Sequence, residues 1–225
     1  MDTTLSVPQQ SQSPSLDPSI NETINRIIDD LITSLPDPKQ LTSDERRGII
    51  ARYSAVLEGN FIYWMTAAFI AVKSEEARPI LIENLYEEVR DAHPAMLRRF
   101  VRAAHAFPTD LDALAIEEDL TNVRVFLGRL SGVQSVVTMA FFEGFIQRFM
   151  GYLADLATAQ GSADMEYTDV HGVCDIAHTD GLFRALSLES AVNPLEPGKD
   201  LLEGVNLLRT LIERIVFNQA ETVAA

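Results

Sequence analysis

Cysteine is nearly absent from this sequence: Cys174 is the only one in 225 residues. A single cysteine excludes an intrachain disulfide framework and is typical of proteins that work in a reducing cytoplasm. No apolar run reaches the length of about 20 residues that a membrane-spanning helix needs. The N-terminus also lacks the basic start and apolar core of a signal peptide. We therefore expect a cytoplasmic protein without a membrane segment.

Positive charge is scarce as well. The chain carries 18 lysines and arginines against 33 aspartates and glutamates, which gives a net charge of −15. Such a surface repels nucleic-acid phosphates and anionic lipids, so neither is an expected partner. The composition, 47% hydrophobic and 23% charged, is that of a globular protein. A chain of this length buries about 70% of its surface on folding.

Alternating, strand-like patterns are missing too, and no internal repeat is visible. We expect residues 1–18, rich in Ser, Pro and Gln, to form a disordered leader. Residues 19–220 then form one all-α domain, a bundle of seven or so helices. Apolar periodicity, capping boxes and prolines place the helices at about 20–35, 42–72, 74–93, 94–107, 110–130, 132–159, 167–186 and 199–218.

The sharpest pattern lies in residues 169–180. His171, Asp175 and His178 stand at i, i+4 and i+7, so an α-helix places them on one face over two turns. Two imidazoles and a carboxylate in this arrangement are typical of a metal site. Because the set has nitrogen and oxygen ligands but no thiolate, it suits iron, manganese or zinc.

Other helices carry acids or imidazoles in apolar surroundings. Glu58, Glu83 with His93, and Glu143 are the candidates for further metal ligands. Burying an isolated carboxylate is unfavourable by several kcal/mol, and two divalent cations would offset that. For Glu58 and Glu143, a role as a hydrogen-bonded core residue fits the sequence as well as a role as a metal ligand. Glu83, Glu87 and Glu88 form mostly a solvated face, with at most one turned inward.

Taken together, these motifs resemble a known family. They are the stretch from Glu83 to Glu88, then His93-Pro94-x-x-Leu97, then Glu143, and finally His171-x3-Asp175-x2-His178. In order and spacing they are similar to the haem-oxygenase-like diiron oxidases and oxygenases, over roughly residues 45–215. That group shares its fold with thiaminase II and pyrroloquinoline-quinone synthase.

The resemblance implies a ligand set for two Fe(II) ions. Glu58, His93 and part of the later triad would hold one iron, and Glu83 with the rest of the triad the other. Glu143 would be a bridging or late-arriving ligand. Ten residues separate Glu83 from His93, which sets them about 80° apart on an ideal helix. A kink at Pro94 would re-aim His93, or Glu87 would be the ligand instead.

The resemblance also implies the chemistry, an O2-dependent oxidation of a small amino-acid-like or amine substrate in natural-product biosynthesis. N-oxygenation, oxidative C–C cleavage and desaturation are the expected reactions. The expected partners are a substrate, a reductant and, as in many bundle relatives, a second copy in a homodimer. Candidate substrate contacts are the apolar Phe61, Ile62, Met65, Phe142, Ile146 and Met150, with Arg184 or Arg52 for a carboxylate.

Two alternatives remain open from the sequence. One is a fatty-acid oxidative decarboxylase on the same scaffold, which would require a longer apolar pocket. The other is a metal-free thiaminase-like or non-catalytic binding protein, in which His171, Asp175 and His178 form only a hydrogen-bond network. The thiaminase type uses a cysteine nucleophile, and Cys174 is no obvious counterpart, which disfavours that version.

Overall fold

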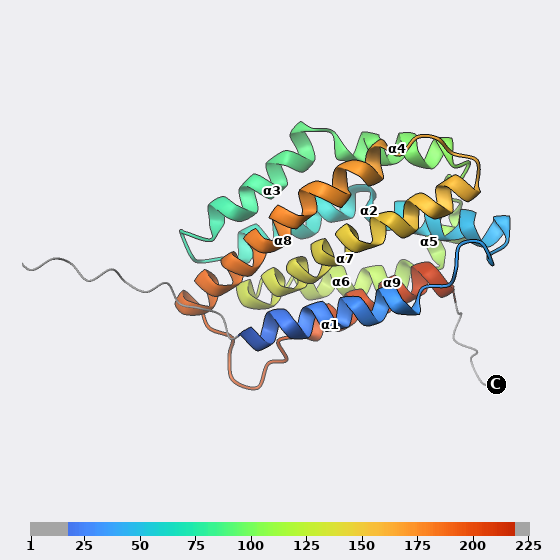
Figure 1. The fold of residues 1–225 in the computed structure, drawn as a ribbon. Helices are drawn as coiled ribbons and strands as arrows, with labels where there is room; N and C mark the ends of the chain where they lie inside the picture. Colours follow the sequence, from blue (N-terminus) through green and yellow to red (C-terminus); the bar gives the residue numbers. More distant parts are fainter. Residues whose placement is uncertain (1–17, 219–225) are drawn as a thin grey trace, which may run out of the picture.

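The computed structural model describes residues 18–218, so the expected leader lies outside the described residues except for Pro18. Within this range the chain is all-α, as predicted (Figure 1). No helix within residues 18–218 is both long and apolar enough to cross a bilayer. The helices are α1 Pro18–Ser34, α2 Ser43–Ala71, α3 Arg78–Arg90, α4 His93–Ala103, α5 Asp110–Leu114, α6 Glu117–Leu127, α7 Gly132–Ala159, α8 Glu166–Val192 and α9 Glu203–Phe217.

A pair of long antiparallel helices, α7 and α8, forms the centre of the bundle (Figure 1). α7 is buried along most of its length, with Phe141, Phe142 and Phe149 almost inaccessible to solvent. Helix α2 packs on α7 from one side, while α3 and α4 bridge α2 and α8. Residues on α3, α4, α7 and α8 can therefore meet in the space that these helices enclose.

Helix α2 begins at the predicted capping box. The Thr42 side chain accepts a hydrogen bond from the Glu45 backbone, and the Glu45 carboxylate accepts one from the Thr42 backbone. The helix is interrupted at Glu58 and Gly59, where the backbone leaves the helical region and Gly59 has a φ of 83°. Glycine adopts this left-handed conformation without steric penalty. The interruption turns Glu58 outward, where Arg98 donates a 2.6 Å hydrogen bond to its carboxylate.

A second break separates α3 from α4. The chain leaves the helix after Arg90, passes through Ala92 in the left-handed region (φ 57°), and begins α4 at His93. The Pro94 ring fits here because a proline in the first turn forfeits no helical hydrogen bond. His93, expected at a kink or helix end, thus becomes the first residue of a new helix and points back toward α3.

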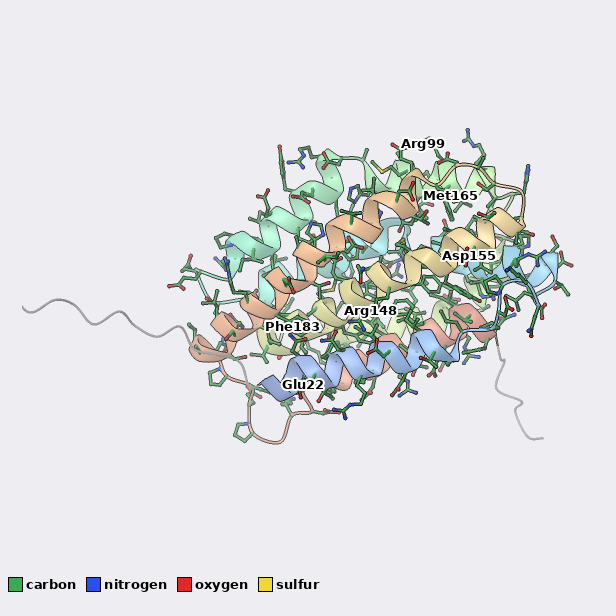
Figure 2. The ribbon with its side chains drawn as sticks, viewed as in Figure 1. Glu22, Arg99, Arg148, Asp155, Met165 and Phe183 are labelled. Atoms are coloured by element: carbon green, nitrogen blue, oxygen red, sulfur yellow. The ribbon has the colours of Figure 1, made fainter. Side chains whose placement is uncertain are left out.

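The remaining helices close the bundle. α1 lies on α7, and Figure 2 shows Arg148 of α7 on the side facing α1. Arg148 pairs there with Asp29, 2.6 Å away. On the far side α9 packs against α6 and α7. The region expected as one weak helix at 110–130 forms two, α5 and α6, and residues 18–218 therefore hold nine helices rather than seven or so.

Glu189 ties the loop after α2 to the end of α8. Its carboxylate is fully buried and accepts hydrogen bonds from the backbone N–H groups of Lys73 and Ser74, each at 2.9 Å. Its other oxygen accepts a 2.8 Å bond from the Asn193 amide. A buried carboxylate with three donors is well satisfied, so this contact fixes where α3 starts relative to α8.

Replacing Glu189 with Ala should destabilise the fold by about 3 kcal/mol, because a buried N–H group at Ser74 and a part-buried one at Lys73 lose their acceptor. Urea denaturation monitored by circular dichroism measures the change. Glu213→Ala is the control, since its exposed pair with Arg209 contributes only about 0.5 kcal/mol. Equal midpoints for the two variants would contradict the assigned role.

Candidate metal centre

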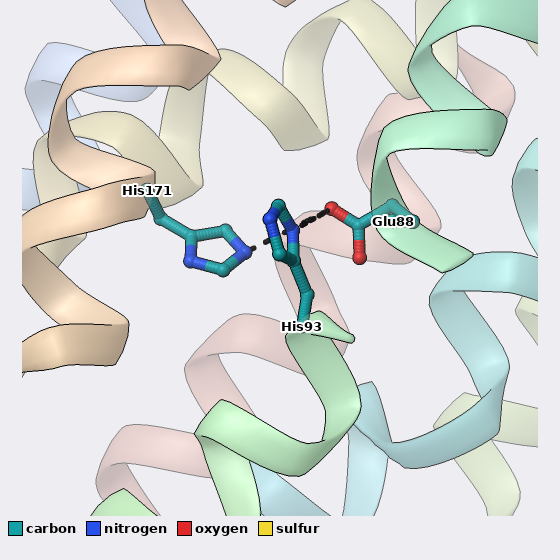
Figure 3. Close-up of side chains that lie close together, drawn as sticks. All are labelled: Glu88, His93 and His171. Carbon is teal, nitrogen blue, oxygen red and sulfur yellow. Dashed lines mark hydrogen bonds and ion pairs between the residues drawn. The ribbon is translucent and has the colours of Figure 1, made fainter. Parts of the chain in front are cut away.

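Glu88, His93 and His171 form a first cluster of metal-binding side chains (Figure 3). They come from α3, the start of α4 and α8, and each is at least nine-tenths buried. Glu88 Oε1 lies 2.7 Å from His93 Nδ1 and 3.8 Å from His171 Nε2. The two imidazole rings face each other edge-on, with centroids 4.5 Å apart. One oxygen and two nitrogen ligands therefore converge on one point.

The backbone orients His171 for this role. Its Nδ1 lies 2.9 Å from the carbonyl oxygen of Tyr167, one turn earlier on α8. A carbonyl only accepts, so Nδ1 carries the proton, and in a neutral ring the lone pair sits on Nε2, facing Glu88. The Tyr167 ring stacks against His171 with centroids 4.3 Å apart. Its hydroxyl is 2.8 Å from that of Tyr53, and this buried phenol pair holds the ring in place.

The electrostatics of the cluster favour an ionised carboxylate. Burial raises the pKa of Glu88, but its contacts with His171 and His93 outweigh burial and lower the pKa to about 2. Burial conversely lowers the pKa of His171, while Glu88 and Asp175 raise it above its ordinary value. Glu88 is thus negatively charged at every physiological pH and is an oxygen ligand that needs no deprotonation.

Glu143, Asp175 and His178 form a second cluster, built from α7 and α8. His178 Nδ1 lies 3.6 Å from Asp175 Oδ1 and 4.0 Å from Glu143 Oε1. On its outer side, His178 Nε2 contacts Glu87 Oε2 of α3 at 2.8 Å. Asn84, one turn before Glu88, donates a 2.9 Å hydrogen bond from Nδ2 to Glu143.

Two buried carboxylates make this cluster strongly electronegative. Burial raises the pKa of Glu143 well above its ordinary value, the charge of Asp175 raises it further, and His178 and Asn84 only partly oppose this. Burial lowers the pKa of His178, but the Asp175, Glu143 and Glu87 carboxylates outweigh it and raise the pKa to about 9. Without a metal, the histidine proton balances the charge that a cation would otherwise neutralise.

The donor chemistry of both clusters fits iron. Each offers imidazole nitrogen and carboxylate oxygen, all ligand atoms of a cluster lie within 4.8 Å of one another, and neither set contains a thiolate. In the second cluster His178 Nδ1 is buried and, among the described residues, has no hydrogen-bond partner. Buried polar atoms usually have a hydrogen-bond partner, so a buried nitrogen without one is consistent with a role as a metal ligand.

One cavity joins the two clusters. Glu88, His93 and His171 of the first cluster and Glu143 of the second all line it. The remaining wall is mostly apolar and comes from Leu57, Phe61, Ile62, Pro94, Leu97, Ile146 and Tyr167. No lysine or arginine is among these lining residues, so apart from the ligand side chains and the Tyr167 phenol the cavity wall is hydrocarbon. The interruption of α2 at Gly59 exposes Leu57 and Phe61 toward this space.

The second cluster also borders a surface groove between α3 and α8. The groove is lined by Pro79, Ile80, Glu83, Asn84, Glu87, Ala177, His178, Gly181 and Arg184. Its lining residues are thus separate from those of the cavity: Glu143 of the second cluster lines the cavity, and His178 of the same cluster lines the groove.

The structure gathers five of the seven predicted metal ligands: His93, Glu143, His171, Asp175 and His178. Glu58 and Glu83 lie in neither cluster. Glu58 is turned out by the interruption of α2 and pairs with Arg98. Glu83 is exposed at the rim of the groove, because the buried face of α3 carries Leu81, Asn84 and Glu88 instead.

Glu88 is the cluster member that sequence reasoning did not select. The sequence predicts that at most one acid of Glu83, Glu87 and Glu88 faces inward, and the buried one is Glu88, only 6% exposed. Helical phase was available as a guide, since Leu81 and Glu88 are seven residues apart on one face. The pairing of Glu88 with His93 does not follow from helical phase, because the break at Ala92 separates the two residues into different helices.

The predicted substrate contacts also fall into two groups, those that line the cavity and those that do not. Phe61, Ile62 and Ile146 line the cavity. Phe142 instead packs its ring against Phe61 and Trp64, behind the wall, and Met65 and Met150 are buried core residues. Arg184 lines the groove rather than the cavity. Arg52 is buried elsewhere and donates to the Ile215 carbonyl oxygen at 2.8 Å.

Comparison with known proteins adds one finding. A family model described as "iron-containing redox enzyme" matches residues 51–209, more than half of the chain. That span includes every residue of both clusters and most of the cavity wall. No curated protein shows a significant match to the chain.

Metal binding should release protons and strengthen with pH. Because the pKa of His178 is raised to about 9 and that of Glu143 is raised too, a cation must displace protons below that pH. Each displaced proton raises affinity about tenfold per pH unit. Anaerobic Fe(II) calorimetry between pH 6.5 and 8, in buffers of different ionisation enthalpy, measures both effects. An affinity independent of pH over this range would contradict the assignment.

Proposed function

The chain belongs to the family of iron-containing redox enzymes, and from this membership and the two ligand clusters we propose that it is a non-haem diiron oxidase or oxygenase. It uses O2 to oxidise a small amine or amino-acid-like molecule. The observation that carries the proposal is the convergence of two nitrogen- and oxygen-ligand clusters on one cavity. When bound there, iron supplies the redox chemistry by which O2 is reduced and an organic molecule is oxidised.

The protein's own residues hold and orient the reacting partners. Glu88, His93 and His171 would hold one iron, and Glu143, Asp175 and His178 the other. Glu88 contributes a permanent negative charge, and the Tyr167 carbonyl fixes the ring of His171. These outer contacts matter because a ligand that is held in place binds metal more tightly and in one geometry.

The cavity wall supports a small substrate with an apolar part. Leu57, Phe61 and Ile146 provide a hydrocarbon surface that excludes water and packs against the substrate. The lining includes no lysine or arginine to pair with a carboxylate, which favours a neutral or amine-bearing reacting end at the metal side. Burial raises the pKa of Tyr167 well above its ordinary value, so its phenol remains neutral in the cavity wall while its hydroxyl is paired with that of Tyr53.

The two alternatives are less well supported. A fatty acid requires a long apolar channel, whereas seven residues besides the cluster ligands line this cavity. A metal-free network would satisfy its own buried nitrogens, yet among the described residues His178 Nδ1 has no hydrogen-bond partner. An iron-containing family also favours a metal-dependent activity.

The deciding experiment is anaerobic Fe(II) loading followed by exposure to O2. The loaded protein should bind two iron ions per chain and consume O2 faster than the same concentration of free Fe(II). Consumption should rise further with a panel of amines and amino acids. A chain that binds no iron, or that leaves the rate of O2 uptake unchanged from free Fe(II), would remove this function.

Glu88→Gln and Glu58→Gln make a matched pair for locating the ligands. Each removes one carboxylate charge while keeping the side-chain size. Glu88→Gln should weaken iron binding at the first cluster at least tenfold, an effect on the order of that for a lost ligand contact. Glu58→Gln should leave both affinities unchanged, because Glu58 pairs with Arg98 outside the clusters. Iron stoichiometry after equilibrium dialysis distinguishes them, and the reverse ranking would restore Glu58 as a ligand.

Ile62→Trp tests the cavity as the substrate site. Ile62 is only partly buried in the wall, so a larger ring can be accommodated while narrowing the cavity. KM for an accepted amine should rise about tenfold with iron content unchanged. The adjacent Tyr63, 46% exposed, supplies the control Tyr63→Trp. If both variants behave like the unmodified protein, the substrate binds elsewhere.

A further inference from the structure

The groove between α3 and α8 carries polar groups that the proposed oxidation does not use. Glu83 and Glu87 of α3 face Ala177, His178 and Arg184 of α8 across it, with Asn84 at its buried side. The acids that line the cavity, Glu88 and Glu143, both belong to the clusters, whereas the groove carries Glu83 and Glu87, which belong to neither. Only the groove therefore offers carboxylates ahead of the buried ligands.

Oxygen and nitrogen donors in the groove follow a gradient of burial. Glu83 is exposed, the Glu87 side chain is 29% exposed, and the His178 side chain is 10% exposed. Beyond His178 lie Asp175 and Glu143 of the second cluster, both almost fully buried. Glu87 and His178 are already in contact at 2.8 Å. A divalent cation moving inward would exchange its waters for these ligands one step at a time.

Asn84 gives an independent indication that a cation passes here. The residue is 2% exposed, and its Nδ2 donates to Glu143 while its Oδ1 is buried without a hydrogen-bond partner among the described residues. A buried amide oxygen left without a donor is unfavourable. Amide oxygens are suitable ligands for hard divalent cations, and this one borders both the groove and the second cluster.

We propose that the α3–α8 groove is the route by which Fe(II) enters the second cluster, with Glu83 as the first ligand at the mouth and Glu87 and Asn84 Oδ1 as transit ligands. The inference rests on the proposed function, since it presumes that the clusters hold iron. It separates the paths of the two reactants: the metal enters between α3 and α8, and the organic substrate occupies the apolar cavity. In this role the exposed Glu83 affects the rate of iron binding but not the equilibrium affinity.

Charge at the groove should control the rate of entry. Glu83 and Glu87 attract a cation, while Arg184, six residues beyond His178 on α8, repels it. Charges beside a narrow entrance change association rates by tenfold or more at low ionic strength. Glu83→Gln should slow entry three- to tenfold, and Arg184→Gln should speed it two- to threefold. Raising the salt concentration should reduce both effects.

The test measures the rate and the equilibrium of Co(II) binding to the metal-free protein, using stopped-flow visible absorption at low ionic strength. Co(II) stands in for Fe(II) because it shares the charge and the ligand preference and is stable in air. Glu83→Gln is compared with Glu118→Gln, the same change at an exposed position on α6. Ala177→Trp, which fills the groove, is compared with Val173→Trp one turn earlier on α8, where the side chain is 73% exposed.

We expect Glu83→Gln and Ala177→Trp to lower the binding rate, the latter at least tenfold, with dissociation constants within twofold of the unmodified protein. The two control variants should bind at the unmodified rate. Equal rates in test and control variants would overturn the route. So would a dissociation constant that rises in step with the slower rate, because Glu83 would then be a permanent ligand. A protein that binds no Co(II) at any concentration would also remove the proposed function, whereas unchanged rates with normal affinity would leave that function standing.

Discussion

The structure depends on the burial of three carboxylates and three imidazoles among four helices, α3, α4, α7 and α8. Glu88, Glu143 and Asp175 are each no more than 6% exposed, and the three histidines are nearly as inaccessible. Isolated charges in such surroundings destabilise a fold by several kcal/mol each. Mutual contacts offset part of this for Glu88, whose pKa is lowered, but not for Glu143, whose pKa is raised. The second cluster is therefore the part of the molecule that would gain most from a bound cation.

Two departures from regular helix geometry create the space for this site. At Gly59 the interruption of α2 turns Glu58 outward and brings Leu57 and Phe61 to the cavity wall. At Ala92 the break between α3 and α4 directs His93 back onto Glu88, only five residues earlier. A continuous helix could not bring side chains at that spacing within 2.7 Å of each other, since they would point about 140° apart. Backbone irregularity thus supplies ligand geometry that helical periodicity alone does not.

These two departures also mark the limit of prediction from the sequence. The all-α fold, the bounds of α7 and the His171–Asp175–His178 arrangement followed from periodicity within single helices, where 3.6 residues per turn fixes which side chains share a face. The positions of Glu58 and Glu88 depend on breaks at Gly59 and Ala92. Gly59 lies within a strongly apolar helical pattern. Ala92 has a left-handed backbone conformation, which residues with a Cβ atom rarely adopt. Gly59 gives no signal of a break without knowledge of the packing around it. Pro94 does predict a helix end at His93, but nothing in the sequence indicates that Ala92 directs His93 onto Glu88.

The chemistry of the two openings follows from which helices border them. α2 and α4 contribute mostly apolar side chains to the cavity, so most of its wall outside the ligands is hydrocarbon. α3 presents one face to the cavity and the next to the groove, with Glu88 on the first and Glu83 and Glu87 on the second. The acids that are not cluster ligands border the groove alone, and under the proposed entry route a cation meets them before it meets the buried ligands. Neighbouring positions on α3 thus face different compartments.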